Sequence, residues 1–244
     1  MKIIDSAVRL NSENGRLKTE ECLAQLEQAG IVHAVIAPSD EFVTIYNKPA
    51  NEQILALVKR FPEKFTGLAV ANPWYGKPAV ELLERYFKAG LGGLYLHPQR
   101  QGFLLTEPIL HPLIEVCRRH RKPVYAHTGT PVCSEPFQLA CLARRFPEVP
   151  FIMGHAAWSD FSGYDVFPAA QQAKNIFVEM SCAWGGLGKK LAEQLDPGRV
   201  LFGSGYPRSN PSVEVRKLRA LRLGELVEEK IFCGNAMKLW KLSL

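Results

Sequence analysis

The sequence has no Cys-x-x-Cys pair and no close group of cysteines. Its six cysteines are widely spaced along the chain: Cys22, Cys117, Cys133, Cys141, Cys182 and Cys233. This spacing excludes a zinc knuckle and a disulfide framework, since both need thiols at short, regular intervals. We therefore expect free thiols, most of them buried.

Long apolar runs are also absent. A membrane-spanning helix needs about 20 consecutive apolar residues, and no stretch of the sequence comes near that length. Residues 1–10 are an apolar segment interrupted by Asp5, which is typical of a strand and not of a signal peptide. These absences predict a cytoplasmic protein with no membrane partner.

The basic residues are not clustered in one part of the sequence. The net charge is +6, from 30 Lys and Arg against 24 Asp and Glu, but the basic residues are spread over several predicted helices. A nucleic-acid-binding surface would gather them on one face, so we expect no nucleic-acid partner. With 47% hydrophobic and 22% charged residues, the chain has the composition of an ordinary globular protein.

What the sequence does contain is a regular alternation of short apolar runs and amphipathic segments. The apolar runs predict eight strands, at residues 2–5, 34–38, 65–70, 93–97, 123–127, 151–155, 176–180 and 200–203. Apolar residues at helical spacing predict eight helices between and after them, at 19–30, 51–61, 77–90, 107–120, 136–146, 167–174, 187–195 and 212–221. A terminal helix over 232–244 would close the base or side of the fold.

Eight such units of roughly 30 residues each favour a (β/α)8 barrel, an α/β fold that would occupy residues 1–244 as a single domain. The alternative is an open, doubly wound sheet. No glycine-rich fingerprint follows the first predicted strand, and this weakens that alternative.

In a barrel of this kind the functional side chains lie at the carboxyl ends of the strands. Histidines end two consecutive predicted strands, His127 in PVYAHTG and His155 in FIMGHAAW, which favours a site over two isolated core histidines. The other strand ends carry Ala7, Arg9, Tyr95, His97, Glu179, Gly205 and Tyr206.

The order of these motifs resembles the amidohydrolase superfamily, in its branch of metal-dependent hydrolases and decarboxylases that act on carboxylated or lactone substrates. The similar stretches are MKIIDSAVRL, GLYLHPQRQGF, PVYAHTG, FIMGHAAW, VLFGSGYPRSNP and IFCGNAMKLW, and they span nearly the whole chain. The resemblance implies a (β/α)8 barrel, a divalent metal such as zinc, and a small carboxylated substrate. It places family metal ligands on His127 and His155.

The sequence departs from the family pattern at three other positions. The His-x-His pair of the first strand falls on Ala7 and Arg9, and the Asp of the last strand falls on Gly205. A catalytic zinc typically has three protein ligands, whereas alanine has no donor atom and arginine has no lone pair to offer. We therefore expect an incomplete metal site, or one rebuilt with a carboxylate of Glu179, Asp160 or Asp165.

A second interpretation gives Arg9 a role of its own. A guanidinium beside His127 and His155 would form a cationic pocket for a carboxylate or phosphate. We predict His127 and His155 as acid–base groups, and assign substrate contacts to Arg9, Tyr95, His97, Glu179, Tyr206 and Arg208. The simpler alternatives are a salt bridge for Arg9, a turn-supporting His97-Pro98 pair, and a Lys or Arg partner for Glu179.

Three functions stay open at this point. The first is a hydrolase or lyase with a remodelled or metal-free site, holding one divalent metal at low occupancy or none. The second is an inactive barrel that binds a small acidic molecule, and the third is a structural partner of an active paralogue. A homo-oligomer is compatible with all three.

Overall fold

The computed structural model describes residues 1–10, 12–13, 16–157 and 162–243, and its centre is one sheet of eight parallel strands. In sheet order they are β1 (Ile3–Arg9), β4 (Ile31–Ala37), β5 (Phe65–Val70), β6 (Gly93–Leu96), β7 (Val124–His127), β8 (Phe151–Gly154), β9 (Ile176–Glu179) and β10 (Val200–Leu201). Hydrogen bonds from Ser6 N–H to the Phe202 carbonyl (2.9 Å) and from Arg9 N–H to the Tyr206 carbonyl (2.8 Å) join β1 to the segment at β10. The predicted (β/α)8 barrel is confirmed.

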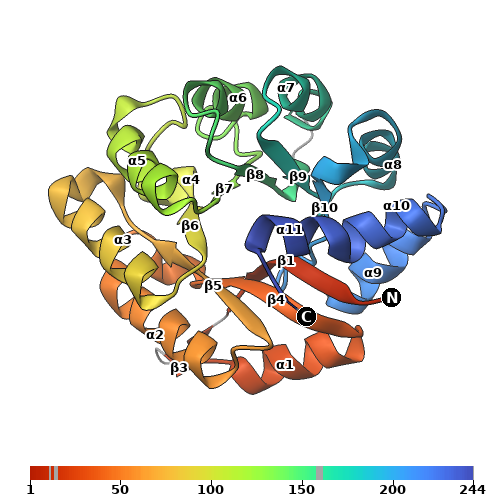
Figure 1. The fold of residues 1–244 in the computed structure, drawn as a ribbon, viewed down its shortest axis with the longest axis horizontal. Coiled ribbons are helices and arrows are strands. Elements are labelled where there is room, and N and C mark those ends of the chain that lie inside the picture. The colour runs from red at the N-terminus through yellow and green to blue at the C-terminus, as the bar shows by residue number, and fades with distance from the viewer. Residues whose placement is uncertain (11, 14–15, 158–161, 244) are drawn as a thin grey trace.

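Helices surround the strands as a ring (Figure 1). They are α1 (Thr19–Gln28), α2 (Asn47–Arg60), α3 (Lys77–Ala89), α4 (Pro98–Gln101), α5 (His111–His120), α6 (Pro136–Arg145), α7 (Val166–Gln172), α8 (Gly185–Gln194), α9 (Pro211–Arg219), α10 (Glu225–Glu229) and α11 (Asn235–Trp240). The α3 helix shows why such segments are helical, since it buries Ala79, Leu83, Tyr86 and Phe87 along one side and ends at Gly90 with φ 118°.

Several boundaries differ from the predicted ones, among them the start of β4, which lies at Ile31 and not at residue 34. The first strand continues to Arg9, and the C-terminal helical segment begins at Glu225 and passes through a π-helical turn, Lys230–Gly234, before α11. Helix α2 begins four residues before the predicted start at residue 51. Asn47 and Asn51 are buried although they are polar. The first turn of this helix therefore shows no apolar pattern in the sequence.

A short hairpin of β2 (Ser12–Glu13) and β3 (Arg16–Leu17) follows β1 and was not predicted. Strands of two residues are too short to show a period-2 pattern.

The N-terminal end of the barrel is covered by α11, which lies across β1 and β10 (Figure 1). Its Trp240 ring packs so closely on Gly93, the first residue of β6, that a Cβ atom there would stand 3.1 Å from it. Because this end is closed by packing, any chemistry that uses the barrel axis belongs at the opposite end. Among the described helices, none combines the length and apolarity needed to cross a bilayer.

Candidate functional site

The carboxyl ends of β6, β7 and β8 bring three histidine rings into contact. The rings of His97 and His127 are stacked with their centroids 4.0 Å apart and their planes at 15°. The His127 and His155 centroids are 4.7 Å apart, at 63°. These histidines come from three neighbouring strands of the sheet, so the cluster depends on the parallel pairing of β6, β7 and β8 and not on local sequence.

Arg9, at the end of β1, reaches this cluster from the other side of the barrel. Its Nη1 atom lies 2.9 Å from Nε2 of His155, and its Nε atom lies 3.7 Å from an oxygen of Asp40. Arg9 as a residue is 7% exposed, and its guanidinium remains charged at any ordinary pH. A permanent cation therefore sits at the mouth of the barrel, within hydrogen-bonding distance of a histidine predicted to hold metal.

Glu179, at the end of β9, lies under His155 and is completely buried. One of its oxygens, Oε2, accepts hydrogen bonds from the Tyr125 hydroxyl (2.7 Å), the His155 backbone N–H (3.0 Å) and the Ser181 hydroxyl (2.9 Å). The other oxygen accepts the Ser181 backbone N–H. The predicted alternative of a Lys or Arg partner is replaced by hydroxyl and amide donors.

Burial sets the protonation of these groups. It lowers the pKa of His155 and of His127 well below the ordinary value, and nearby positive charges on Arg9 and Arg208 lower both further. Burial also lowers the pKa of His97 to about 4, although Asp40 opposes this shift. The three imidazoles are therefore neutral near pH 7, and Arg9 is the charge that a ligand would meet among them.

The Nδ1 atoms of His97 and His127 are buried and make no hydrogen bond within the described residues, and the buried Tyr95 hydroxyl interacts with the Arg9 guanidinium. Burial raises the pKa of Tyr95 to about 12 despite the opposing charge of Arg9, so its hydroxyl keeps its proton. A buried polar group without a partner costs free energy, and a ligand or water that satisfied it would recover that cost.

Not every predicted site residue joins the cluster. The Tyr206 hydroxyl points to α1, where it lies 3.5 Å from an oxygen of Glu21. Arg208 is exposed in the loop after β10, close enough for its charge to influence the histidines. Asp165 precedes α7, and none of its described contacts connects it to the histidines. Asp160 lies outside the described residues.

Gly205 adopts φ +66°, a conformation that favours glycine, and its N–H donates to the Ala7 carbonyl at 2.9 Å. A Cβ atom at this position would stand 3.1 Å from Cβ of Ser181. The position that carries Asp in the family pattern is therefore both conformationally and sterically suited to glycine.

Ser181, Tyr125 and Asp40 also contact the site, and the sequence did not predict them. Period-2 alternation in a strand puts Tyr125 on the same face as His127, so the pattern of β7 contains the signal for it. Ser181 lies two residues beyond Glu179 and follows the same rule, whereas nothing local marks Asp40, which begins a short 3-10 helix, Asp40–Phe42, between β4 and α2.

His155 begins a left-handed turn. His155, Ala156 and Ala157 have φ values of 62°, 44° and 47°, and all three are buried. Such a conformation costs an L-residue roughly 1–2 kcal/mol. Strain of this kind gathers at functional sites because the surrounding contacts hold it in place.

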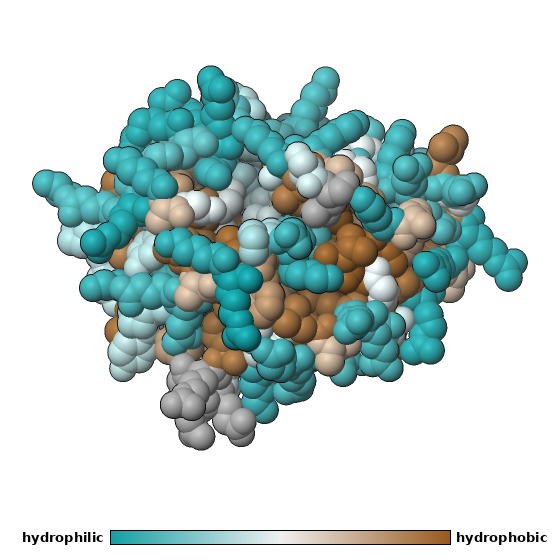
Figure 2. Space-filling view, turned by 60° about the horizontal axis from the view of Figure 1, so that its bottom comes forward, coloured by the Kyte–Doolittle hydropathy of each residue, from teal (hydrophilic) through white to brown (hydrophobic). Residues whose placement is uncertain are grey.

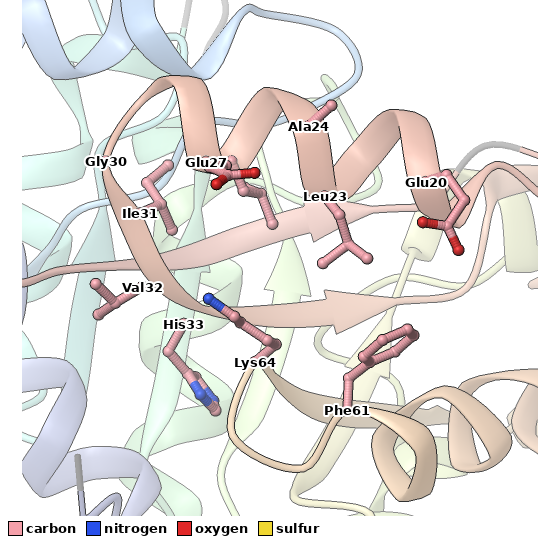
Figure 3. Close-up of a pocket in the computed structure, with 11 residues that line it drawn as sticks. Glu20, Leu23, Ala24, Glu27, Gly30, Ile31, Val32, His33, Phe61 and Lys64 are labelled. Carbon is pink, nitrogen blue, oxygen red and sulfur yellow. The ribbon is translucent and has the colours of Figure 1, made fainter.

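A separate groove of about 630 Å³ lies beside α1, near the start of β4 (Figure 3). It is lined by Leu23, Ala24, Val32 and Phe61, with Glu27 and Lys64 at its rim. Figure 2 shows apolar side chains gathered on the side of the molecule that carries α1 and α2. The groove is near the N-terminal end of the strands and is lined by His33 but not by His97, His127, His155 or Arg9, so it is not the candidate catalytic site.

Residues 13–242 match the family model described as Amidohydrolase, which covers most of the chain. The chain belongs to the amidohydrolase family. The resemblance predicted from the strand-end motifs is thereby confirmed. No curated protein matches the sequence at a significant level.

Solved structures similar to this amidohydrolase cover nearly its whole length. An uncharacterised TIM-barrel protein from Bordetella bronchiseptica is 19% identical with a TM-score of 0.80, over 98% of each chain. The 5-carboxyvanillate decarboxylase of Sphingomonas paucimobilis is 16% identical with a TM-score of 0.80, over 99% of each chain. A dihydroxybenzoic acid decarboxylase from Polaromonas sp. JS666, with bound manganese and the inhibitor 2-nitroresorcinol, is 14% identical with a TM-score of 0.79, over 99% of this chain and 97% of that one. At these identities the likeness shows the fold.

Manganese in the Polaromonas structure raises the question of a metal in this amidohydrolase. Within the described ranges, no group of three or more His, Cys, Asp or Glu side chains is arranged to hold a metal ion. The two nitrogens of His155 already have Arg9 and Ser181 as partners, and both oxygens of Glu179 accept hydrogen bonds. These donors do not fit a metal ion as they are arranged.

Proposed function

We propose that this amidohydrolase is a hydrolase or lyase that acts on a small carboxylated molecule without a catalytic metal. Arg9 would bind the carboxylate, and His127 would be the acid–base group. The single observation that carries the proposal is the buried guanidinium of Arg9, held 2.9 Å from Nε2 of His155 at the mouth of the barrel.

The charge of the site supports an acidic ligand. The histidines around Arg9 are held neutral by burial. Arg9 forms a salt bridge with Asp40, 3.7 Å from Nε, but Asp40 also pairs with Arg100 at 3.1 Å, so one carboxylate is shared by two guanidinium groups. Guanidinium groups bind carboxylates through two parallel hydrogen bonds in a site that excludes water. The Tyr95 hydroxyl, which keeps its proton beside Arg9, is a further donor near this position.

We propose a reaction without a metal because the His155 side chain that would bind the metal is already engaged. A metal ion on His155 would need a ring nitrogen that Arg9 or Ser181 already uses. It would also be repelled by the guanidinium. In the family a metal polarises the group to be cleaved, and we assign that electrostatic role to Arg9.

A second candidate is an inactive barrel that binds the same acidic molecule. One observation favours it: both nitrogens of His155 have partners, so only His127 of the two predicted acid–base residues has a ring nitrogen without one. Binding needs only the cation and its donors, whereas acid–base catalysis needs a group that can exchange a proton.

The test uses chelator-treated protein and two aromatic acids. They are 5-carboxyvanillate, named for the Sphingomonas decarboxylase, and 2,6-dihydroxybenzoate, named for another decarboxylase of similar structure. Calorimetry would measure binding, and absorbance would follow loss of substrate. Arg9→Gln is the test variant, and Arg118→Gln, an exposed arginine of α5, is the matched control.

We expect binding that survives the chelator, is lost in Arg9→Gln and is kept in Arg118→Gln. Turnover under these conditions supports the enzyme, and binding without turnover supports the inactive barrel. Binding that appears only when manganese or zinc is added would overturn both.

A further inference from the structure

Glu179 makes its hydrogen bonds entirely with donors. The Tyr125 hydroxyl, the His155 backbone N–H, and the backbone N–H and hydroxyl of Ser181 all donate to its two oxygens. An ionised carboxylate only accepts hydrogen bonds, whereas a protonated one needs an acceptor for its own proton. The arrangement therefore fits a buried, negatively charged Glu179.

The direction of each hydrogen bond from Glu179 to Arg9 can be assigned. Ser181 has one hydroxyl proton and donates it to Oε2 of Glu179 at 2.9 Å. Toward Nδ1 of His155, 2.5 Å away, the same hydroxyl must therefore accept, so Nδ1 carries a proton. On the other side of the ring Arg9 has only donors, so Nε2 of His155 must accept.

This assignment leaves one state of His155 compatible with both neighbours, the neutral ring protonated at Nδ1. In the opposite tautomer, Nε2 would carry the proton and would face the N–H of Arg9, so two donors would meet. Nδ1 would then be an acceptor facing the Ser181 hydroxyl, which already donates its proton to Glu179. The protonated ring would meet the same conflict at Arg9.

We infer that Glu179 and Ser181 are positioning residues for Arg9, because they fix the tautomer of His155 and so aim its Nε2 lone pair at the guanidinium. A line of hydrogen bonds thus connects a buried cation, Arg9, to a buried anion, Glu179, through two neutral side chains. The inference rests on the proposed function only where it concerns ligand affinity.

The backbone supports the same arrangement. Glu179 accepts the backbone N–H of His155 at 3.0 Å, and this residue has a left-handed φ of 62°. Oε2 of Glu179 therefore holds the main chain of His155 directly and its ring through Ser181. Both contacts are needed to fix the direction of Nε2.

The experiment compares Ser181→Ala with Tyr125→Phe. Each removes one hydroxyl that donates to Oε2 of Glu179, but only Ser181 also bonds the His155 ring. Nitrogen-15 NMR of the imidazoles reports which ring nitrogen carries the proton, and calorimetry with benzoate reports the affinity for a simple carboxylate.

In the unaltered protein we expect His155 to be protonated at Nδ1. Ser181→Ala removes the acceptor of the Nδ1 proton, so the other tautomer should gain population at the expense of the contact between Nε2 and Arg9. Benzoate binding should then weaken about tenfold, the loss of a hydrogen bond to a charged group. Tyr125→Phe should leave the tautomer unchanged, since the Tyr125 hydroxyl makes no hydrogen bond with the His155 ring, and it should weaken benzoate binding less than Ser181→Ala does.

A proton on Nε2 of His155 in the unaltered protein would overturn the inference. So would a Ser181→Ala variant that matches Tyr125→Phe in tautomer and affinity. If benzoate fails to bind the unaltered protein, the proposed function fails, but the NMR measurement still decides the positioning role. If Ser181→Ala does not fold, Ser181→Thr keeps the hydroxyl and should keep the Nδ1 tautomer, and the opposite tautomer in it would contradict the inference.

Discussion

Arg9 and His155 are 146 residues apart in the sequence, and Nη1 of the first lies 2.9 Å from Nε2 of the second. The contact joins the first strand of the barrel to the loop after β8, across the mouth. It places a fixed positive charge on a histidine nitrogen that the family resemblance assigns to a metal.

The first prediction concerns the identity of the cation. Arg9→Lys keeps the charge but loses the planar pair of donors, so we expect benzoate to bind about tenfold more weakly than to the unaltered protein. Arg9→Gln should bind more weakly still, since it also loses the charge. Calorimetry at one salt concentration checks both, and equal affinities for all three proteins would show that Arg9 does not contact the carboxylate.

The second prediction is that a metal site can be restored at Arg9. Arg9→His frees Nε2 of His155 and adds a third imidazole near His127, which gives the three protein ligands that zinc usually needs. We expect the variant to bind zinc in a one-to-one ratio, measured by elemental analysis after dialysis.

Arg9→Gln is the matched control, because it also frees Nε2 but supplies no metal ligand. Zinc bound equally by both variants would mean that the guanidinium, and not a missing ligand, is what keeps metal away. Adding Gly205→Asp should lower the melting temperature, because Gly205 has φ +66° and a Cβ there would crowd Ser181.

The strands and most helices could be predicted because β-branched runs and helical periodicity are local properties of the sequence. The order of strand ends then located Arg9, His127 and His155 at one edge of a parallel barrel. Ser181 carries the period-2 signal of its strand but was not assigned, whereas Asp40 escaped prediction because its pairing with Arg9 joins two different strand ends. Tyr206, in contrast, was predicted to contact the substrate, but its hydroxyl points to Glu21 and only its backbone pairs with Arg9.

The third prediction is that acid destabilises the fold between about pH 6.5 and pH 4. The pKa of His97 is lowered to about 4 in the folded protein, so in this interval the unfolded chain binds more protons than the folded one. Stability is therefore present above pH 6.5 and falls as pH falls toward 4, by up to about 3 kcal/mol from His97. His127 and His155 act in the same direction, and the raised pKa of buried Glu179 acts in the opposite one.

Urea unfolding at several pH values would measure this dependence. His97→Asn, which cannot be protonated, should flatten the slope between pH 4 and 6.5. An unchanged slope in the variant would show that His97 is accessible to protons in the folded state.

The fourth prediction concerns the left-handed turn after β8. Ala156 has φ 44° and ψ 43°, where glycine has no steric cost. Ala156→Gly should therefore stabilise the protein by about 1 kcal/mol, or a rise of about 2–4 °C in melting temperature for a chain of this size. Ala140→Gly in the middle of α6 is the control and should lower the melting temperature, since glycine weakens a helix. A fall in both variants would count against a strained Ala156.

The central claim is that Arg9, and not a metal ion, supplies the positive charge at His155. Titration of the chelator-treated protein with manganese, followed by calorimetry, tests it most directly. We predict no stoichiometric binding and an affinity for benzoate that manganese leaves unchanged. One manganese ion bound per chain, lost in a His155→Asn variant and needed for benzoate to bind, would contradict the account.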